Sequence, residues 1–424
     1  MSTAEILCFW GGFFSFVQCG RKGEIGNREG AMLRRRDFLK AIPAVSAASL
    51  IGAGRAKITD VRLVRLKLLK EVGTYPDWVG GTRYSRIGGG AIVQVHTDQG
   101  VIGIGPDVDP AQIPQIKNLL VGADPFDIES HAARLSSMPS SGLRGPASVE
   151  IALWDLVGKL TNQPLSKLWG GGRDRVPPYS SMLRLSTPEE RADIAAKLKS
   201  EGWQAIKYRC SFERMKDDIR LVELTRKAVG DDWVITCDGN KAGLNRASTR
   251  GVPWDFTRAA ETAKEYQRMN VYWLEEPLPR YDFDGLAELN RLVEMKLAGG
   301  EANRGLHEFR SLLEKGCFDI VQPEIMLLGP TLLRKIAILA ESMNKLCIPH
   351  VGDMRLGTIC DLHLIASWPN APYIEIFNEV PVGDYTYPFS IFEEPPVLDK
   401  QGFFKVPEGP GLGMTIKKEF LENA

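Results

Sequence analysis

The sequence has no excess of either charge sign, because 53 Lys and Arg residues balance 53 Asp and Glu residues across 424 positions. The lack of a basic excess argues against a nucleic-acid-binding protein, and the lack of an acidic excess argues against an acidic disordered tail. Cysteine is scarce, with seven residues and no CxxC pair, which argues against a disulfide framework and a zinc site. No uncharged apolar run reaches the roughly 18 residues of a membrane span. The remaining composition, 44% hydrophobic and 25% charged, is typical of a globular protein.

An export signal is predicted near the N-terminus. The sequence RRRDFLK at residues 34–40 precedes a weakly apolar stretch, residues 41–54, and the small residue Ala56. This order is typical of a signal peptide, and Arg-Arg-x-Phe-Leu-Lys resembles a twin-arginine signal. We therefore expect residues 32–56 to direct export to the periplasm, and a cytoplasmic protein if the signal is not used.

Met32 stands directly before this signal, so we expect it to be the true start. Residues 1–31 are then a mis-assigned N-terminal extension, and folded sequence begins at Lys57. The alternative is that the arginines form a chance basic cluster on a disordered N-terminus.

The first part of the folded sequence alternates like strands at residues 61–66 and 91–96, then shows helical spacing at 148–160. Pro and Gly breakers place a domain boundary near Tyr179. Between the two strands we predict a Gly-rich, aromatic loop, and such loops often contact ligand. Its candidate substrate-binding residues are Trp78, Thr82, Arg83 and Tyr84.

From residue 180 onward, short apolar strands alternate with longer amphipathic helices. The strand candidates are residues 205–209, 234–238, 272–275, 296–301, 320–323, 347–350 and 373–376. A polar or ionisable residue closes each one, and these residues recur every 23 to 37 positions, which is one strand-plus-helix unit. They are Lys207, Asp238, Glu275, Glu301, Glu324, His350 and Glu375. Repeated units of this kind predict an α/β fold with a closed parallel barrel whose active site lies at the carboxyl ends of the strands.

Three of these residues, Asp238, Glu275 and Glu301, end consecutive strands and would lie side by side in a barrel. Three adjacent anions are costly unless a cation joins them, and oxygen ligands suit Mg²⁺. The alternative is three separate salt bridges to helix lysines.

Strand alternation refines the choice among neighbours. Only one of Glu275 and Glu276 is expected to point inward, and Glu275 closes the apolar strand. By the same rule Lys207 and Arg209 share one face. Asn240 is paired with Asp238 in this way, and we count Asn240 and Glu375 among the candidate substrate-binding residues.

His350 is one of only five histidines and follows a strand end, opposite Lys207 across the expected barrel. Glu324 ends the preceding strand and can accept a hydrogen bond from one imidazole nitrogen. Such a bond fixes the tautomer and raises the pKa of the other nitrogen. We therefore predict a catalytic His350 oriented by Glu324, against the alternative of a structural histidine.

The whole constellation resembles the enolase superfamily in its mandelate racemase/muconate lactonizing enzyme-like branch, over about residues 57 to 424. The resemblance rests on the order and spacing of several short motifs. They are EIALWDL at 150–156, QPLSKLWGG at 163–171, LEEPL at 274–278, AGGE at 298–301, DIVQPE at 319–324, PH at 349–350 and GPGLG at 409–413.

The resemblance implies a modified TIM (β/α) barrel, residues 181–375, with an α+β capping domain built from residues 57–180 and the returning segment 376–424. It implies Mg²⁺ on Asp238, Glu275 and Glu301, and a small-molecule carboxylate substrate whose α-proton is removed by a base. Acid-sugar dehydratases form much of this branch and yield 2-keto-3-deoxy acids. We also expect a homo-oligomer.

The sequence departs from the family pattern in two places. The usual Lys-x-Lys motif is Lys207-Tyr208-Arg209 here, and arginine keeps its proton, so Arg209 is a poor base. The usual Asp partner of the histidine is Glu324. The first departure argues against a two-base racemase, although Lys207 beside Arg209 is expected to have a lowered pKa and to contribute.

Three functions therefore remain open at this level. The first is a Mg²⁺-dependent sugar-acid dehydratase with His350 as the acid–base group. The second is a racemase or epimerase of a 2-hydroxy acid on the same fold. The third is a barrel that binds a carboxylate without turning it over, which only Arg209 favours.

Overall fold

The computed structural model describes residues 55–139, 142–244 and 251–421. Arg55–Ala424 form one compact unit. The predicted extension, residues 1–31, and all but the end of the predicted signal, residues 32–56, lie outside the described residues. None of the helices in the described part has the length and apolar character needed to cross a bilayer.

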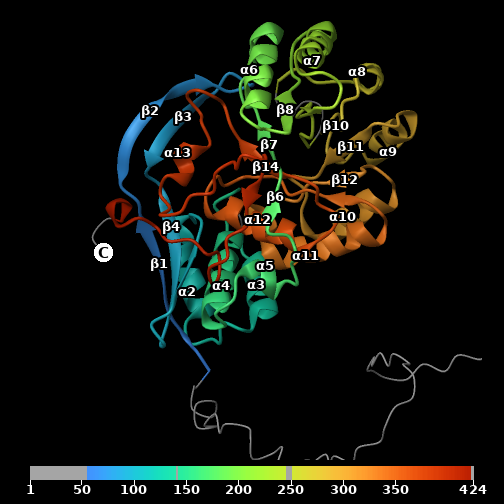
Figure 1. Cartoon of the computed structure of the whole chain (residues 1–424). Coiled ribbons are helices and arrows are strands. Elements are labelled where there is room, and N and C mark those ends of the chain that lie inside the picture. Colours follow the sequence, from blue (N-terminus) through green and yellow to red (C-terminus); the bar gives the residue numbers. More distant parts are fainter. Residues whose placement is uncertain (1–54, 140–141, 245–250, 422–424) are drawn as a thin grey trace, which may run out of the picture. The chain divides into compact units, whose positions relative to one another are not determined.

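The N-terminal part is a strand-rich cap. A three-stranded antiparallel sheet has the order β1-β4-β5, and a separate hairpin joins β2 to β3 (Figure 1). These strands are β1 Ile58–Arg65, β2 Leu68–Pro76, β3 Thr82–Gly88, β4 Ala91–Thr97 and β5 Ile102–Gly105. The helices of the cap are α2 Ile113–Leu120, α3 Ile128–Ser136 and α4 Ala147–Leu160. Residues 68–88, expected to be a loop around its aromatic residues, are therefore mostly paired strand, with Pro76 opposite Thr82.

Helix α4 lies directly against β5 because two glycines leave room for it. A Cβ atom added at Gly103 would come within 2.1 Å of the Ala152 carbonyl oxygen, and one at Gly105 within 2.5 Å of the Ser148 oxygen. The buried Asp155 of α4 then accepts hydrogen bonds from Ile104 N and Leu412 N, both at 2.8 Å. The helix thus ties the cap to the C-terminal segment.

The remaining chain forms an eight-stranded parallel sheet in the order β13-β12-β11-β10-β9-β8-β7-β14. Its two end strands are β13 and β14, and Cys347 N of β13 donates a 2.9 Å backbone hydrogen bond to Asn370 O in the segment that leads into β14. The strands are β7 Pro178–Ser181, β8 Ala205–Arg209, β9 Val234–Asp238, β10 Trp273–Glu275, β11 Lys296–Gly299, β12 Ile320–Val321, β13 Leu346–Cys347 and β14 Ile374–Phe377. The predicted barrel-type α/β fold is confirmed, and β7 is a strand that the seven candidates did not include.

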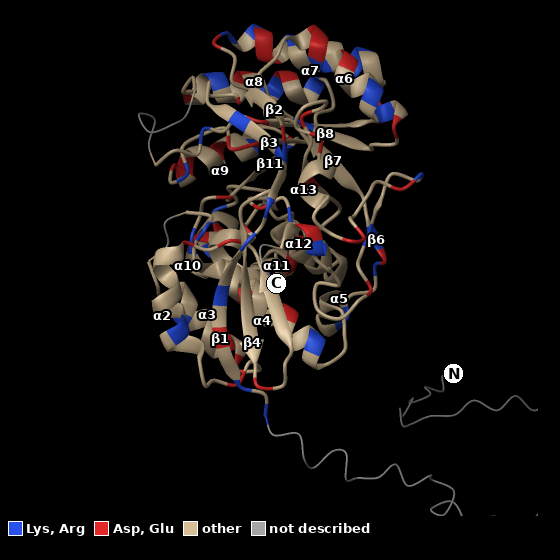
Figure 2. Ribbon diagram, turned by 90° about the vertical axis from the view of Figure 1, so that its left-hand side faces the viewer, with Lys and Arg blue, Asp and Glu red and all other residues tan. Residues whose placement is uncertain are grey.

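Helices cover the outside of this sheet. They are α6 Pro188–Ser200, α7 Met215–Val229, α8 Phe256–Arg268, α9 Phe283–Leu292, α10 Gly305–Glu314, α11 Ile325–Ser342 and α12 Leu356–Ser367. Local chemistry sets their starts: α6, for example, has Thr187 as N-cap, which accepts from Glu190 N, and Pro188 in its first turn. Figure 2 shows both charge signs interspersed along α6, α7 and α8, in keeping with the zero net charge.

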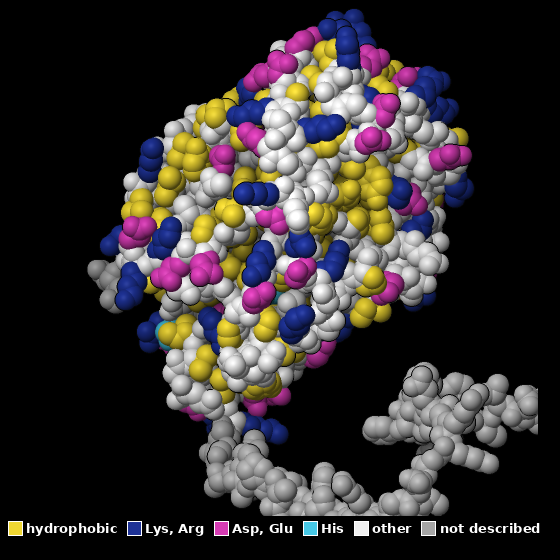
Figure 3. All heavy atoms as spheres, viewed as in Figure 1, with side chains coloured by type: hydrophobic (Ala, Val, Ile, Leu, Met, Phe, Trp, Pro, Cys, Tyr) yellow, Lys and Arg dark blue, Asp and Glu magenta, His cyan; other side chains and the backbone are white. Residues whose placement is uncertain are grey.

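Short elements complete the fold. They are α5 Leu165–Leu168, α13 Thr386–Phe389, the two-stranded pair β6 Arg175–Val176 and β15 Phe404–Lys405, and the 3-10 turns Pro110–Gln112 and Lys418–Phe420. The chain then returns to the cap, where Lys67 N donates to Phe420 O at 2.7 Å. On the face in Figure 3, apolar side chains are scattered among charges of both signs.

Candidate active site

Three carboxylates meet at the carboxyl ends of neighbouring strands. Asp238 ends β9, Glu275 ends β10, and Glu301 lies two residues beyond β11. Asp238 and Glu275 are register partners in the sheet. One ligand oxygen from each of the three residues lies within 4.8 Å of the others, so the sequence prediction that they adjoin holds in the structure.

Two cations from β8 face this cluster. The Lys207 ammonium lies 3.0 Å from Glu275 Oε1 and 2.8 Å from Glu375 Oε1. Arg209 Nη1 pairs with Asp238 Oδ2, and its Nε donates to Met182 O at 3.1 Å. Lys207 and Arg209 are two positions apart on one strand, so the pleat directs both side chains to the same face.

Negative charge still exceeds positive charge at this face. Its carboxylates are Asp238, Glu275, Glu276, Glu301, Glu324 and Glu375, against Lys207, Arg209 and the imidazole of His350. Burial and the charge of Asp238 raise the pKa of Glu275, although Lys207 opposes the shift. A divalent cation would offset such buried negative charge, and a set of three carboxylate oxygens suits Mg²⁺. Asp238, Glu275 and Glu301 are the residues that would hold it.

Glu276 corrects the expectation that only one of the two adjacent glutamates faces the site. Its backbone has a φ of 44°, so strand alternation ends at Glu275. The Glu276 side chain is only 5% exposed and lines a cavity together with Glu301 and Asn240. Burial, followed by the charges of Glu301 and Asp238, raises the pKa of Glu276 well above its usual value. Both glutamates therefore belong to the charged site.

His350 lies between two carboxylates. Its Nδ1 is 2.6 Å from Glu324 Oε2, and its Nε2 is 3.1 Å from Glu301 Oε2. Glu324 is held in place by Met326 N, which donates to Oε1 at 2.7 Å. Burial lowers the pKa of His350, but Glu301, Glu324 and Glu375 together raise it well above the usual value. The imidazole thus points one nitrogen at an orienting acid and the other at the carboxylate cluster.

Lys207 does not have the lowered pKa expected from its neighbour Arg209. Desolvation does lower it, but the charges of Glu275 and Glu375 outweigh this and the net pKa lies above the usual value. Asp238 likewise raises the pKa of Arg209 despite its burial. Both pKa shifts favour the charged form of the side chain.

The structure also places the other two barrel candidates in this network. Asn240 donates from Nδ2 to Asp238 Oδ2 at 2.9 Å and from its backbone N to Oδ1 at 2.8 Å. Glu375 Oε2 accepts from Val351 N at 3.1 Å. Burial raises the pKa of Glu375, but Lys207 and other cations lower it to about 2. Asn240 orients a metal-ligand candidate, and Glu375 is the counter-charge of Lys207.

The four candidate substrate-binding residues of the cap do not all line the same cavity. Trp78 lines the cavity beside Glu301, whereas Arg83 and Tyr84 line a second cavity under β3. Thr82 lines neither of these two cavities. Three of the four residues therefore line two different cavities.

One contact to the cluster was missed at the sequence level. Gln322 Nε2 donates to Glu275 Oε2 at 2.8 Å. Gln322 lies two residues before Glu324, just beyond β12, so the same strand-end rule that selected Glu324 could have found it.

A capping domain over a parallel barrel, with three adjacent carboxylates at the strand ends, defines an enolase-type protein. A family model described as "Enolase C-terminal domain-like" matches residues 190–420, and one described as "Mandelate racemase / muconate lactonizing enzyme, N-terminal domain" matches residues 89–170. The chain belongs to the mandelate racemase/muconate lactonizing enzyme branch of the enolase superfamily.

Individual relatives include sugar-acid enzymes. The chain is 27% identical to L-talarate/galactarate dehydratase of Salmonella typhimurium, over 90% of this chain and 87% of that protein. It is 30% identical to arabinonate dehydratase of Saccharolobus solfataricus, over 66% and 72%. The crystal structure of D-glucarate dehydratase from Agrobacterium tumefaciens complexed with magnesium matches with a TM-score of 0.75 at 25% identity, over 86% of this chain and 97% of that chain.

Proposed function

We propose that the protein is a Mg²⁺-dependent lyase that dehydrates a sugar acid to a 2-keto-3-deoxy acid. The observation that carries this proposal is the placement of His350 between the orienting Glu324 and the carboxylate cluster. The sugar-acid dehydratases among the relatives support the same reaction class.

The cation held by Asp238, Glu275 and Glu301 would supply positive charge beside the substrate carboxylate, which makes the α-proton more acidic. Lys207 and Arg209 add two fixed positive charges close to the same carboxylates. In a dry site such charges stabilise the enediolate that forms when the α-proton leaves.

His350 acts as the acid–base group in this proposal. Its Nε2 removes the proton from C2, and the Glu324 carboxylate stabilises the resulting imidazolium through Nδ1. The same Nε2–H then protonates the 3-hydroxyl, which departs as water in a syn elimination. The enol that remains tautomerises to the 2-keto-3-deoxy acid. Because arginine keeps its proton, Arg209 does not serve as the second base that racemisation needs, and the proposal assigns the acid–base chemistry to His350.

A substrate screen tests the function. The purified protein is incubated with Mg²⁺ and a panel of aldonic and aldaric acids, and 2-keto acid formation is measured. We expect product from at least one acid and none after chelation of the metal. A panel on which the protein forms no product, while it deuterates a 2-hydroxy acid at C2 without loss of water, would favour the racemase instead.

A further inference from the structure

A second cavity extends the active site toward the cap. Its volume is about 380 Å³, within the size range of small-molecule pockets, and it lies under strand β3. Phe377 lines it, and the centroid of this ring is 6.1 Å from that of His350. Gly352 also lines it, and a Cβ added there would come within 2.7 Å of Glu324 Oε2. The cavity therefore adjoins the His350–Glu324 pair.

The charged groups of this cavity are mainly cationic. Arg83, Arg86 and Arg355 line it, together with the acids Asp353 and Asp384. Each acid is already used locally, since its Oδ1 atom accepts backbone N–H groups of its own turn. Backbone N–H groups thus already bind both acids, and the arginines supply the side-chain N–H donors of this lining.

The side chain of Arg355 is held in place by a hydrogen bond, but its charge is not neutralised by an ion pair within the described part of the chain. Its Nη1 donates to Gly89 O at 2.9 Å, and no carboxylate among the described residues forms an ion pair with it. Gly90 makes this position possible, because it has a φ of 77° and a Cβ there would lie 3.0 Å from Arg355 Nη2. The glycine tract at residues 88–90 therefore holds the half-buried Arg355 guanidinium at the cavity wall, where further N–H donors remain available for a ligand.

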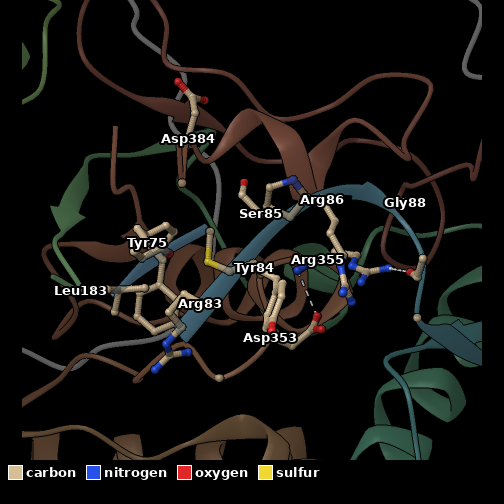
Figure 4. Close-up of a pocket in the computed structure, with 17 residues that line it drawn as sticks. Tyr75, Arg83, Tyr84, Ser85, Arg86, Gly88, Leu183, Asp353, Arg355 and Asp384 are labelled. Atoms are coloured by element: carbon tan, nitrogen blue, oxygen red, sulfur yellow. Dashed lines mark hydrogen bonds between the residues drawn. The ribbon is translucent and has the colours of Figure 1, made fainter. Parts of the chain in front are cut away.

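Arg86 reaches the same end of the cavity as Arg355, whereas the guanidinium of Arg83 points elsewhere (Figure 4). The only ion pair of Arg86 among the described residues is with Glu71 at 3.3 Å, and both side chains are largely exposed. Such a pair contributes little, so it leaves Arg86 free to bind a stronger partner. Arg83, in contrast, pairs with Asp77 at 3.5 Å.

We propose that Arg355 and Arg86 form a subsite for a second carboxylate at the far end of the substrate, which makes the substrate an aldaric acid, a sugar diacid. This inference rests on the proposed function, because it assigns the first carboxylate to the metal site. Arginine binds a carboxylate through paired N–H donors, and a guanidinium fixed in advance loses little freedom on binding.

Paired substrates test the subsite. D-glucarate and D-gluconate share their configuration but differ in the terminal group, as do galactarate and galactonate. We expect a higher kcat/KM for the diacid of a pair, and a fall of the diacid-to-monoacid ratio by about 10- to 100-fold in Arg355→Met and in Arg86→Met. Arg355→Lys should recover part of the ratio because it keeps the charge. Arg62→Met, which removes an exposed arginine of β1, is the control and should leave the ratio unchanged.

Binding measurements distinguish a wrong assignment of the subsite from a wrong assignment of the reaction. Calorimetry is done with Mg²⁺ and the same acid pairs on the His350→Asn variant, which prevents turnover. The diacid of each pair should bind more tightly than the monoacid. This preference should be lost when Arg355→Met or Arg86→Met is added to His350→Asn. Equal binding of diacid and monoacid, or a ratio unchanged in both arginine variants, overturns the subsite even if the protein dehydrates monoacids. Arginine-dependent diacid binding without any turnover upholds the subsite and rejects the dehydratase.

Discussion

The Nδ1 atom of His350 lies 2.6 Å from the Oε2 atom of Glu324, across the ends of two neighbouring strands. The two residues also form a backbone bridge, so the sheet itself fixes their spacing. Glu324 thus stands where the family pattern has aspartate, and its carboxylate is within hydrogen-bond distance of the imidazole.

Glu324→Gln tests this contact. The amide keeps an oxygen that can accept from Nδ1 but loses the charge that helps to raise the pKa of His350. We expect kcat to fall by roughly 10²-fold or more, and the rising acidic limb of the kcat–pH profile to move to lower pH, because the base then deprotonates more readily. Glu324→Asp keeps the charge and should retain more activity than Glu324→Gln; the reverse order would contradict an electrostatic role.

Glu275 and Glu276 offer a matched pair at the metal site. Glu275→Gln should abolish activity and remove the rise in Tm that Mg²⁺ produces in the wild-type protein, because it takes one charge from the trio. Glu276→Gln should retain Mg²⁺-dependent stabilisation, since its side chain is not one of the three grouped carboxylates. If Glu276→Gln alone lost the Mg²⁺ effect, the assignment of ligands would have to be exchanged.

We expect the stability of the protein to depend on pH through Glu150, a buried residue of α4 outside the candidate active site. It is 3% exposed, its Oε1 accepts from Thr331 N at 2.7 Å beyond the Gly329–Pro330 kink of α11, and burial raises its pKa to about 7. A carboxyl with a raised folded-state pKa contributes fully below its unfolded-state pKa and loses that contribution as pH rises through 7.

Glu150→Gln keeps the acceptor and removes the titration. Between about pH 4.5 and 7, the unfolding free energy of the wild-type protein should fall relative to that of Glu150→Gln by roughly 3 kcal/mol. Denaturant unfolding across this pH range measures the difference. Parallel curves for the two proteins would show that Glu150 titrates normally.

Export is a proposal that the sequence alone supports. A chain beginning at Met32 should reach the periplasm of a Gram-negative host and be cleaved near Ala56. Replacing Arg35 and Arg36 by Lys should leave it in the cytoplasm, as fractionation and immunoblotting would show. An unchanged periplasmic yield in that variant would rule out the twin-arginine pathway.

Much of the barrel could be predicted because each strand is apolar and ends in a functional residue. The ranges 205–209 and 234–238 agree with the observed β8 and β9, whereas the candidate 347–350 is shifted from the observed β13 at Leu346–Cys347. Strand β7 was missed because Pro177 precedes it and Pro178 is its first residue, and prolines usually indicate a break.

The site was predictable where strand periodicity holds and not where the backbone departs from it. Asp238, Glu275 and Glu301 followed from their positions at strand ends. Glu276 did not, because its positive φ is a tertiary feature that the two-residue repeat of a strand cannot indicate. The raised pKa of Lys207 was also missed, since it depends on Glu375, which lies 168 positions away in the sequence.

The most direct test of the account is the product formed in D₂O. The wild-type protein with Mg²⁺ is incubated with an accepted sugar acid, and the mixture is followed by ¹H NMR and mass spectrometry. We expect a 2-keto-3-deoxy acid that has lost one water and carries solvent deuterium at C3, with neither elimination nor exchange at C2 in His350→Asn. Exchange at C2 that persists in His350→Asn, or a wild-type product that retains the 3-hydroxyl and differs from the substrate only at C2, would contradict it.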